Sequence, residues 1–244
     1  MVYYLTYTLL GIILLPGIFL AIWAQFKVTS TYNKTRTYMP TSTDKTADVI
    51  AREILDKNGL HNIELTHVDG ELTDHYHPKK GYIALSDASY GQHSIAAISI
   101  AAHEVGHAIQ RKEGHFATRL REFLVPFMRI SDVLLWPLVV IGLIFNIGAS
   151  FNSLIGNIFM WSGVAFFGLA ALFSLVTLPT ELDASKRALQ QLEKGGYLLT
   201  KEELSDAKSM LTAAALTYIA SLLVAILNFA RFLLTILILR NEDR

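Results

Sequence analysis

Residues Ser94–Gly114, SIAAISIAAHEVGHAIQRKEG, carry the signals of one buried helix. Serine is a preferred helix N-cap, and glycine commonly follows a helix end. The run Ile95–Ala102 is almost entirely apolar on every face, which predicts a helix inside a core. The segment is too short to cross a bilayer. It nevertheless holds two histidines and a glutamate, and buried titratable groups need a partner.

The composition of the whole chain favours a membrane protein. Of its 244 residues, 52% are hydrophobic and 17% are charged, with 21 basic and 21 acidic residues. This balance leaves no excess positive field for phosphates, so we expect no nucleic-acid partner. The chain has no cysteine, so any metal site must use nitrogen and oxygen ligands.

Uncharged stretches predict four transmembrane helices. Residues 3–24 hold no charge and lack the flanks of a signal peptide, so we expect a retained anchor. Residues 133–180 are long enough for two crossings, and the turn-favouring sequence NIGASFNSLIGN at 146–157 makes them a hairpin. Residues 209–230 continue after Arg231 as FLLTILIL, either as one tilted helix or as a broken pair.

Basic residues set the expected orientation. They cluster after the first span and before the second, at Lys27, Lys34, Arg36, Arg119, Arg121 and Arg129. By the positive-inside rule we expect the N-terminus outside and residues 27–130 on the cytoplasmic side. Arg240 and Arg244 fall on the outer side, against this rule.

We therefore expect a predominantly α-helical membrane protein of five parts. These are an N-terminal anchor (1–26), a cytoplasmic part (27–130), a transmembrane hairpin (131–178), a cytoplasmic helix (179–208) and a C-terminal transmembrane helix with its tail (209–244).

The cytoplasmic part has the pattern of an α+β core. TDKTADVIAREILDKNGL at 43–60 repeats apolar residues at helical spacing. NIELTHV, ELTDHYH and GYIALS, at 62–68, 71–77 and 81–86, predict three short strands of a small sheet.

The HEVGH motif suits a metal site. His103 and His107 lie four residues apart, so both rings aim at one point, as a tetrahedral zinc ion requires. Glu104 is rotated by about 100° from His103, outside the ligands but within reach of a metal-bound water. We expect Glu104 to act as the general base that takes the proton of this water during attack on a peptide carbonyl.

The motif is short, so two core histidines and a surface glutamate are the alternative interpretation. A buried glutamate between buried histidines is costly without a compensating cation, which favours the metal. The small residues Ala101, Ala102, Gly106 and Ala108 leave room for the ion.

A third ligand is expected in LPTELDASKRALQQL, residues 178–192. Pro179 and Thr180 predict a helix that starts where the third span ends. Because the hairpin returns the chain to the side it left, Glu181 emerges on the same membrane side as the histidines. We favour Glu181, with Asp183 as a fallback, although both residues also suit simple helix capping.

With these segments the chain resembles the YugP-type neutral zinc metallopeptidases of bacterial membranes. The matching segments are LTDHYHP, YIALS, SIAAISIAAHEVGHAIQ, LPTELDASKRAL and LTAAALTYIASLL, in that order. The resemblance implies a multi-pass membrane protease with a zincin-like, zinc-binding core. It also implies that His77, where the family usually has aspartate, is a poor ligand.

A more distant similarity is to the HtpX-like membrane proteases, whose third-ligand motif is E-x-x-x-D. Glu181 matches the first letter, but Ser185 replaces the aspartate. Ser185 can still hydrogen-bond a ligand imidazole, and Asp183 is a second candidate for such an outer contact. His75 and His77 share one face of a strand, which leaves a second metal site open against exposed polar residues.

Similarity to zincins also implies a strand edge that pairs with an extended substrate. We expect this edge in Tyr82, Ile83, Ala84 and Leu85. The group that stabilises the oxyanion stays open among Tyr76, His75, Tyr197 and Arg187.

The sequence thus predicts a zinc endopeptidase with one Zn²⁺ per chain, which cuts proteins or peptides at the lipid bilayer. The alternative is a metal-stabilised membrane scaffold or chaperone cofactor that cuts nothing. A transporter is disfavoured because the spans lack acidic residues at mid-membrane.

Overall fold

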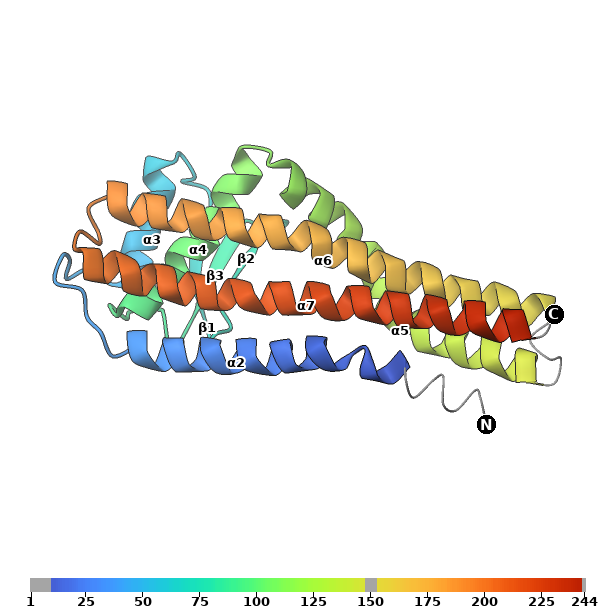
Figure 1. The fold of residues 1–244 in the computed structure, drawn as a ribbon. Helices are drawn as coiled ribbons and strands as arrows, with labels where there is room; N and C mark the ends of the chain where they lie inside the picture. Colours follow the sequence, from blue (N-terminus) through green and yellow to red (C-terminus); the bar gives the residue numbers. More distant parts are fainter. Residues whose placement is uncertain (1–9, 148–152, 243–244) are drawn as a thin grey trace. The chain divides into compact units, whose positions relative to one another are not determined.

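The computed structural model describes residues 10–147 and 153–242 (Figure 1). The elements in chain order are α2 (Leu15–Thr35), α3 (Ala47–Lys57), β1 (Glu64–Val68), β2 (His75–His77), β3 (Tyr82–Ser86), α4 (Ile95–Lys112), α5 (Phe116–Ile147), α6 (Leu154–Lys194) and α7 (Lys201–Glu242). The predicted fold class, a mainly helical membrane protein with a small sheet, is confirmed. The chain divides into two compact units.

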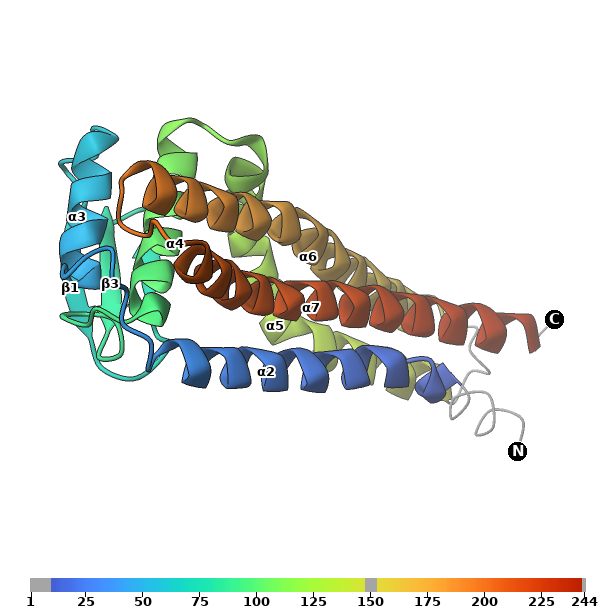
Figure 2. The same ribbon diagram turned by 60° about the vertical axis from the view of Figure 1, so that its left-hand side comes forward.

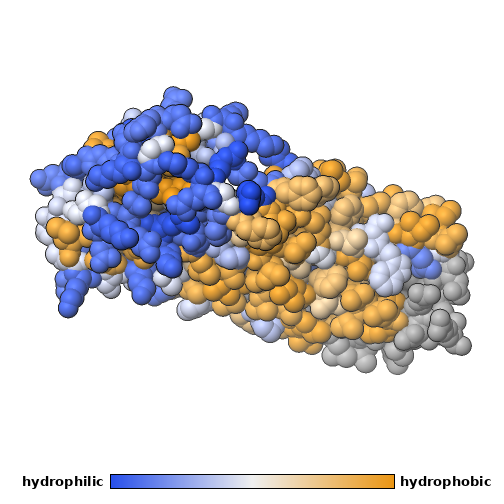
Figure 3. Space-filling model, turned by 90° about the horizontal axis from the view of Figure 1, so that it is seen from above, coloured by the Kyte–Doolittle hydropathy of each residue, from blue (hydrophilic) through white to orange (hydrophobic). Residues whose placement is uncertain are grey.

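The first, which we call the apolar unit, comprises Met1–Trp23, Leu120–Leu178 and Tyr218–Arg244. Within the described residues, four helices are long and apolar enough to cross a membrane, at Leu10–Thr35, Phe116–Asn146, Leu154–Lys194 and Lys201–Ile238. Hydrophobic residues cover this unit on the face drawn in Figure 3. Four spans were expected. Residues 3–9 of the first predicted span and 148–152 of the predicted turn lie outside the described residues.

The second, which we call the α/β unit, comprises Ala24–Arg119 and Pro179–Thr217. Helices α3 and α4 pack beside its sheet (Figure 2). Their fully buried residues include Ile50, Ile54, Ile98 and Val105. The expected end signals of α4 are confirmed, since Ser94 Oγ accepts a hydrogen bond from Ala97 N at 3.2 Å and Gly114 has a φ of 67°.

The sheet has three strands in the order β1-β3-β2. β1 runs parallel to β3, with Glu64 opposite Tyr82, and β2 runs antiparallel to it, with Tyr76 opposite Ile83. β3 therefore lies between two neighbours. The expectation that Tyr82, Ile83, Ala84 and Leu85 offer a free edge is wrong, because both sides of β3 are already paired. The outer strands are β1 and β2.

Two long helices differ from the expected division of the chain. α6 continues through Pro179 to Lys194 instead of restarting there, and α7 runs from Lys201 to Glu242 as one helix. A proline removes one backbone hydrogen bond, and a helix that is packed beyond it can continue. Ala188 and Leu192 supply that packing in the core of the α/β unit, and Ala184 is buried against Gly106.

Candidate metal centre

Small residues let α4 and α6 approach closely at the HEVGH motif. A Cβ atom added to Gly106 would lie 2.6 Å from the backbone oxygen of Ala184. Real Cβ atoms essentially never come this close to another atom, so only glycine fits at this crossing. The approach brings His103, His107 and Glu181 together from two helices.

Three candidate ligand atoms converge. The Nε2 atoms of His103 and His107 lie 3.2 and 3.4 Å from Oε2 of Glu181. Ligands at about 2.05 Å from a tetrahedral zinc ion are roughly 3.3 Å apart, so the spacing fits the ion. Glu181 is the most buried of the three, with 3% of its side chain exposed, against 15% for His103 and 13% for His107. Such burial suits a carboxylate whose charge a cation compensates.

The other ring nitrogens have partners that fix their roles. The Gln110 amide donates to the Thr180 carbonyl and to Asp183, at 2.7 and 2.8 Å. Its Oε1, which can only accept, therefore takes the Nδ1–H of His107 at 3.1 Å. Nε2 of His107 is thereby left with a lone pair for a metal.

His103 has a comparable partner. Its Nδ1 lies 3.2 Å from the Ser185 hydroxyl, in agreement with the outer contact expected of that serine. Asp183 instead accepts hydrogen bonds from Gln110 and, at 2.6 Å, from Arg187 Nε. Asp183 thus contacts Gln110, the partner of His107, and is not one of the three residues whose candidate ligand atoms converge.

Gln110 is a residue that the sequence analysis missed. The available signal is its position, three residues after His107 on the same helix, which places both side chains on one face. Glutamine at such a position is otherwise unremarkable in sequence, because its role depends on contacts with α6.

Glu104 lies beside the ligand group and outside it, as expected from its rotation. It is buried, and its Oε2 accepts a hydrogen bond of 2.8 Å from the backbone N–H of Tyr76 in β2. The outer strand of the sheet therefore holds the carboxylate of Glu104 in place.

The charge of Glu181 also acts on His107. Burial lowers the pKa of the His107 imidazole, but the hydrogen bond and the negative charge of Glu181 outweigh burial, so the pKa is raised. In the absence of a cation the carboxylate thus attracts a proton to the ring. The same attraction favours a metal cation.

Three histidines outside the HEVGH motif have other neighbours. His75 and His77 both contact the ring of Tyr82, at centroid distances of 5.9 and 5.2 Å, and do not belong to a candidate metal group in the described residues. A group of three exposed side chains, His67, Asp69 and Asp87, does come together. The sequence analysis did not predict it, because the group forms only where β1 pairs with β3: His67 lies in β1 and Asp69 follows that strand, whereas Asp87 follows β3.

Two of the four oxyanion candidates are tied to other partners. Tyr197 donates its hydroxyl to Glu53 at 2.8 Å, and burial together with this carboxylate raises the pKa of Tyr197 to about 12. Arg187 pairs with Asp183 and Glu113, each at 2.6 Å.

Comparisons with known proteins relate the chain to zinc metallopeptidases. Residues 10–237 match the family described as "Putative neutral zinc metallopeptidase". The "Putative membrane protease YugP" of Bacillus subtilis (strain 168) is 38% identical over 225 residues, which cover 92% of this chain and 95% of that relative. No solved structure matches the chain.

Proposed function

The chain belongs to the family of neutral zinc metallopeptidases, and we propose that it is a membrane endopeptidase in which His103, His107 and Glu181 hold one zinc ion. The observation that carries the proposal is the convergence of three ligand atoms from two helices, with the Nε2 atoms of His103 and His107 at 3.2 and 3.4 Å from Oε2 of Glu181. Family membership supports zinc and peptide hydrolysis. The assignment of roles to single residues is ours.

A bound zinc ion would polarise a peptide carbonyl and make a water molecule more acidic. Glu104 is the proposed general base. Its carboxylate lies next to the ligand group, and the N–H of Tyr76 orients one of its oxygens. The other oxygen can take the proton of the attacking water and pass it to the leaving amine. A structural metal site has no need of such a carboxylate.

The proposed substrates are membrane proteins or chains that lie at the bilayer surface. Glu181 follows the apolar part of α6, which ends at Leu178, within the same helix. A ligand three residues beyond an apolar segment belongs near the lipid boundary. We also propose that residues 27–130, which contain the HEVGH motif, face the cytoplasm and that the N-terminus lies outside, because basic residues flank this segment on both sides.

The test compares three variants of the full-length protein in detergent. Glu104→Gln should keep one zinc per chain and lose casein cleavage by at least a hundredfold, because it removes the base and spares the ligands. Glu181→Ala should lose most of the zinc. Glu193→Gln, an exposed glutamate of α6, is the matched control and should change neither quantity.

Zinc content by mass spectrometry and cleavage with and without a chelator give the readouts. Full cleavage by Glu104→Gln would refute the assignment of the base. A zinc-loaded wild type that cuts nothing would instead favour a metal-stabilised scaffold.

A further inference from the structure

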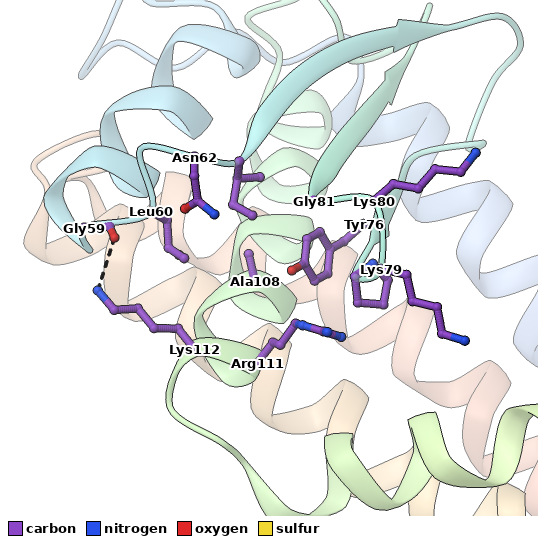
Figure 4. Close-up of a pocket in the computed structure, with 12 residues that line it drawn as sticks. Gly59, Leu60, Asn62, Tyr76, Lys79, Lys80, Gly81, Ala108, Arg111 and Lys112 are labelled. Atoms are coloured by element: carbon purple, nitrogen blue, oxygen red, sulfur yellow. Dashed lines mark hydrogen bonds between the residues drawn. The ribbon is translucent and has the colours of Figure 1, made fainter.

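A basic pocket of about 630 Å³ opens in the α/β unit (Figure 4). Its cations are Lys79, Lys80, Arg111 and Lys112, and Tyr76 and Ala108 form part of its wall. None of its described lining residues is acidic. Four positive charges without a lining carboxylate create a strong local field for an anion.

The pocket begins at a residue that contacts the proposed general base. The backbone N–H of Tyr76 holds Glu104, and the Tyr76 side chain lines the pocket. On α4, Glu104, Ala108 and Arg111 are spaced by four and three residues, so they lie along one face of the helix. The same helix face thus leads from the base into the basic pocket.

The distance suits a peptide. Seven residues of helix separate Glu104 from Arg111, which is roughly 10 Å along the axis. An extended chain covers about 3.3 Å per residue, so about three substrate residues bridge this distance. β2 is an outer strand of the sheet, and Lys79 and Lys80, which follow it after Pro78, are exposed at the pocket.

The lining suits a carboxylate on a short aliphatic chain. Leu60, Ile63 and Ala108 are buried apolar residues that can contact methylene groups. Lys112 is already held by the backbone oxygens of Asn58 and Gly59, which positions its charge. In Figure 4 the side chain of Arg111 extends toward Tyr76, where a guanidinium can bind both oxygens of a carboxylate.

We propose that the basic pocket is a specificity subsite for a carboxylate of the peptide substrate, about three residues from the bond that is cut. This inference rests on the proposed function. It adds the substrate class: the protein prefers acidic segments, or chain ends with a free carboxylate, at one fixed position from the cleaved bond.

The test uses the full-length, zinc-loaded protein in detergent and internally quenched peptides built on a casein segment that it cuts. Each of three positions on either side of the bond carries Glu in one peptide and Gln in its partner. At one position Glu should raise kcat/KM about tenfold, because two partly exposed charge pairs each contribute roughly twofold to fivefold. Peptides that end there in a carboxylate or an amide separate the two carboxylate sources.

Charge reversal identifies the residues responsible. Lys79→Glu/Lys80→Glu should abolish the preference for Glu, and Lys194→Glu/Lys201→Glu, at two exposed lysines outside the pocket, should retain it. The inactive Glu104→Gln protein provides a readout without turnover. By fluorescence anisotropy it should bind the Glu peptide more tightly than the Gln peptide, and the pocket reversal should remove this difference.

Three outcomes would overturn the proposal. Equal kcat/KM for Glu and Gln at all six positions removes the subsite and leaves the peptidase intact. Absence of any cleavage by the zinc-loaded wild type overturns the proposed function and the subsite with it. A reversal variant with unchanged peptide selectivity but weakened binding of phosphatidylglycerol nanodiscs assigns the pocket to a lipid headgroup.

Discussion

The two units of the chain differ in how far their large apolar side chains are buried within the protein. In the apolar unit, large residues such as Phe19 and Trp136 are 67% and 64% exposed within the protein, although they are as hydrophobic as any core residue. In the α/β unit, Ile98 and Val105 are completely buried by the chain itself. Exposed apolar surface of this extent requires another solvent, which for four long helices is lipid.

This difference in burial indicates which positions tolerate substitution. Contacts between lipid and side chain place few demands on shape, whereas α4 and α6 must meet with atomic precision to bring three ligands together. Substitutions of equal size should therefore have unequal effects in the two units.

Two helical glycines give the sharpest contrast. Gly106→Ala places a Cβ against the backbone of Ala184, so we expect a loss of about 3 kcal/mol and of most bound zinc. Gly168→Ala meets only the flexible ring of Phe229, at 3.3 Å, and should cost less than about 1 kcal/mol. The effects of both substitutions are measured by the apparent Tm in detergent and by the zinc content. Equal effects would contradict the contrast between the units.

A second large effect is expected at Glu203, which is buried at the start of α7. Its carboxylate accepts backbone hydrogen bonds from Thr41, Ser42, Leu199 and Thr200 at 2.6 to 3.1 Å. Glu203→Gln turns an amide group toward these donors and should cost about 2 kcal/mol.

The exposed neighbour Glu202 provides the control for Glu203. Glu202→Gln should change stability by less than about 0.5 kcal/mol. A similar drop in apparent Tm for both variants would refute the special role of Glu203.

Removal of the Gln110 contact should weaken zinc binding without removing a ligand. Gln110→Ala leaves Nδ1 of His107 without its acceptor, and such outer partners typically contribute at least tenfold to metal affinity. Competition with a fluorescent zinc chelator measures this change. Gln190→Ala, elsewhere in the α/β unit, is the control, and an unchanged affinity for Gln110→Ala would show that His107 needs no orientation.

The smallest expected effect concerns pH. Hydrogen bonds from Lys45 and Tyr197 lower the pKa of Glu53 below its ordinary 4.5, so the ionised form stabilises the fold above that pH. This stabilisation, about 0.5 kcal/mol after solvent screening, is lost as the pH falls through the pKa in the folded state. The Tm difference between wild type and Glu53→Gln should therefore shrink from pH 6 to pH 3. A difference that grows on acidification would contradict the sign.

Local spacing made part of this picture predictable from sequence. His103, Glu104 and His107 share one helix, so their relation follows from helix geometry alone. Glu181 could be predicted as a ligand because the hairpin fixes the side of the membrane to which the chain returns. The four apolar helices followed from length and composition.

The features that could not be predicted from the sequence depend on long-range packing. The neighbours of β3 depend on which strands pair, and no local pattern in Tyr82–Ser86 encodes that choice. Continuation of α6 through Pro179 depends on core contacts of residues that follow it. Gln110 acquires a role only because Thr180 and Asp183 approach it from another helix.

The central claim is that two imidazoles of α4 and one carboxylate of α6 bind one zinc ion. X-ray absorption spectroscopy of the purified, zinc-loaded full-length protein tests it most directly. We predict one zinc per chain with two histidine nitrogens and oxygen ligands at about 2.0 to 2.2 Å, and loss of this spectrum in Glu181→Ala. A protein without stoichiometric zinc, or an identical spectrum in the Glu181→Ala variant, would contradict the account.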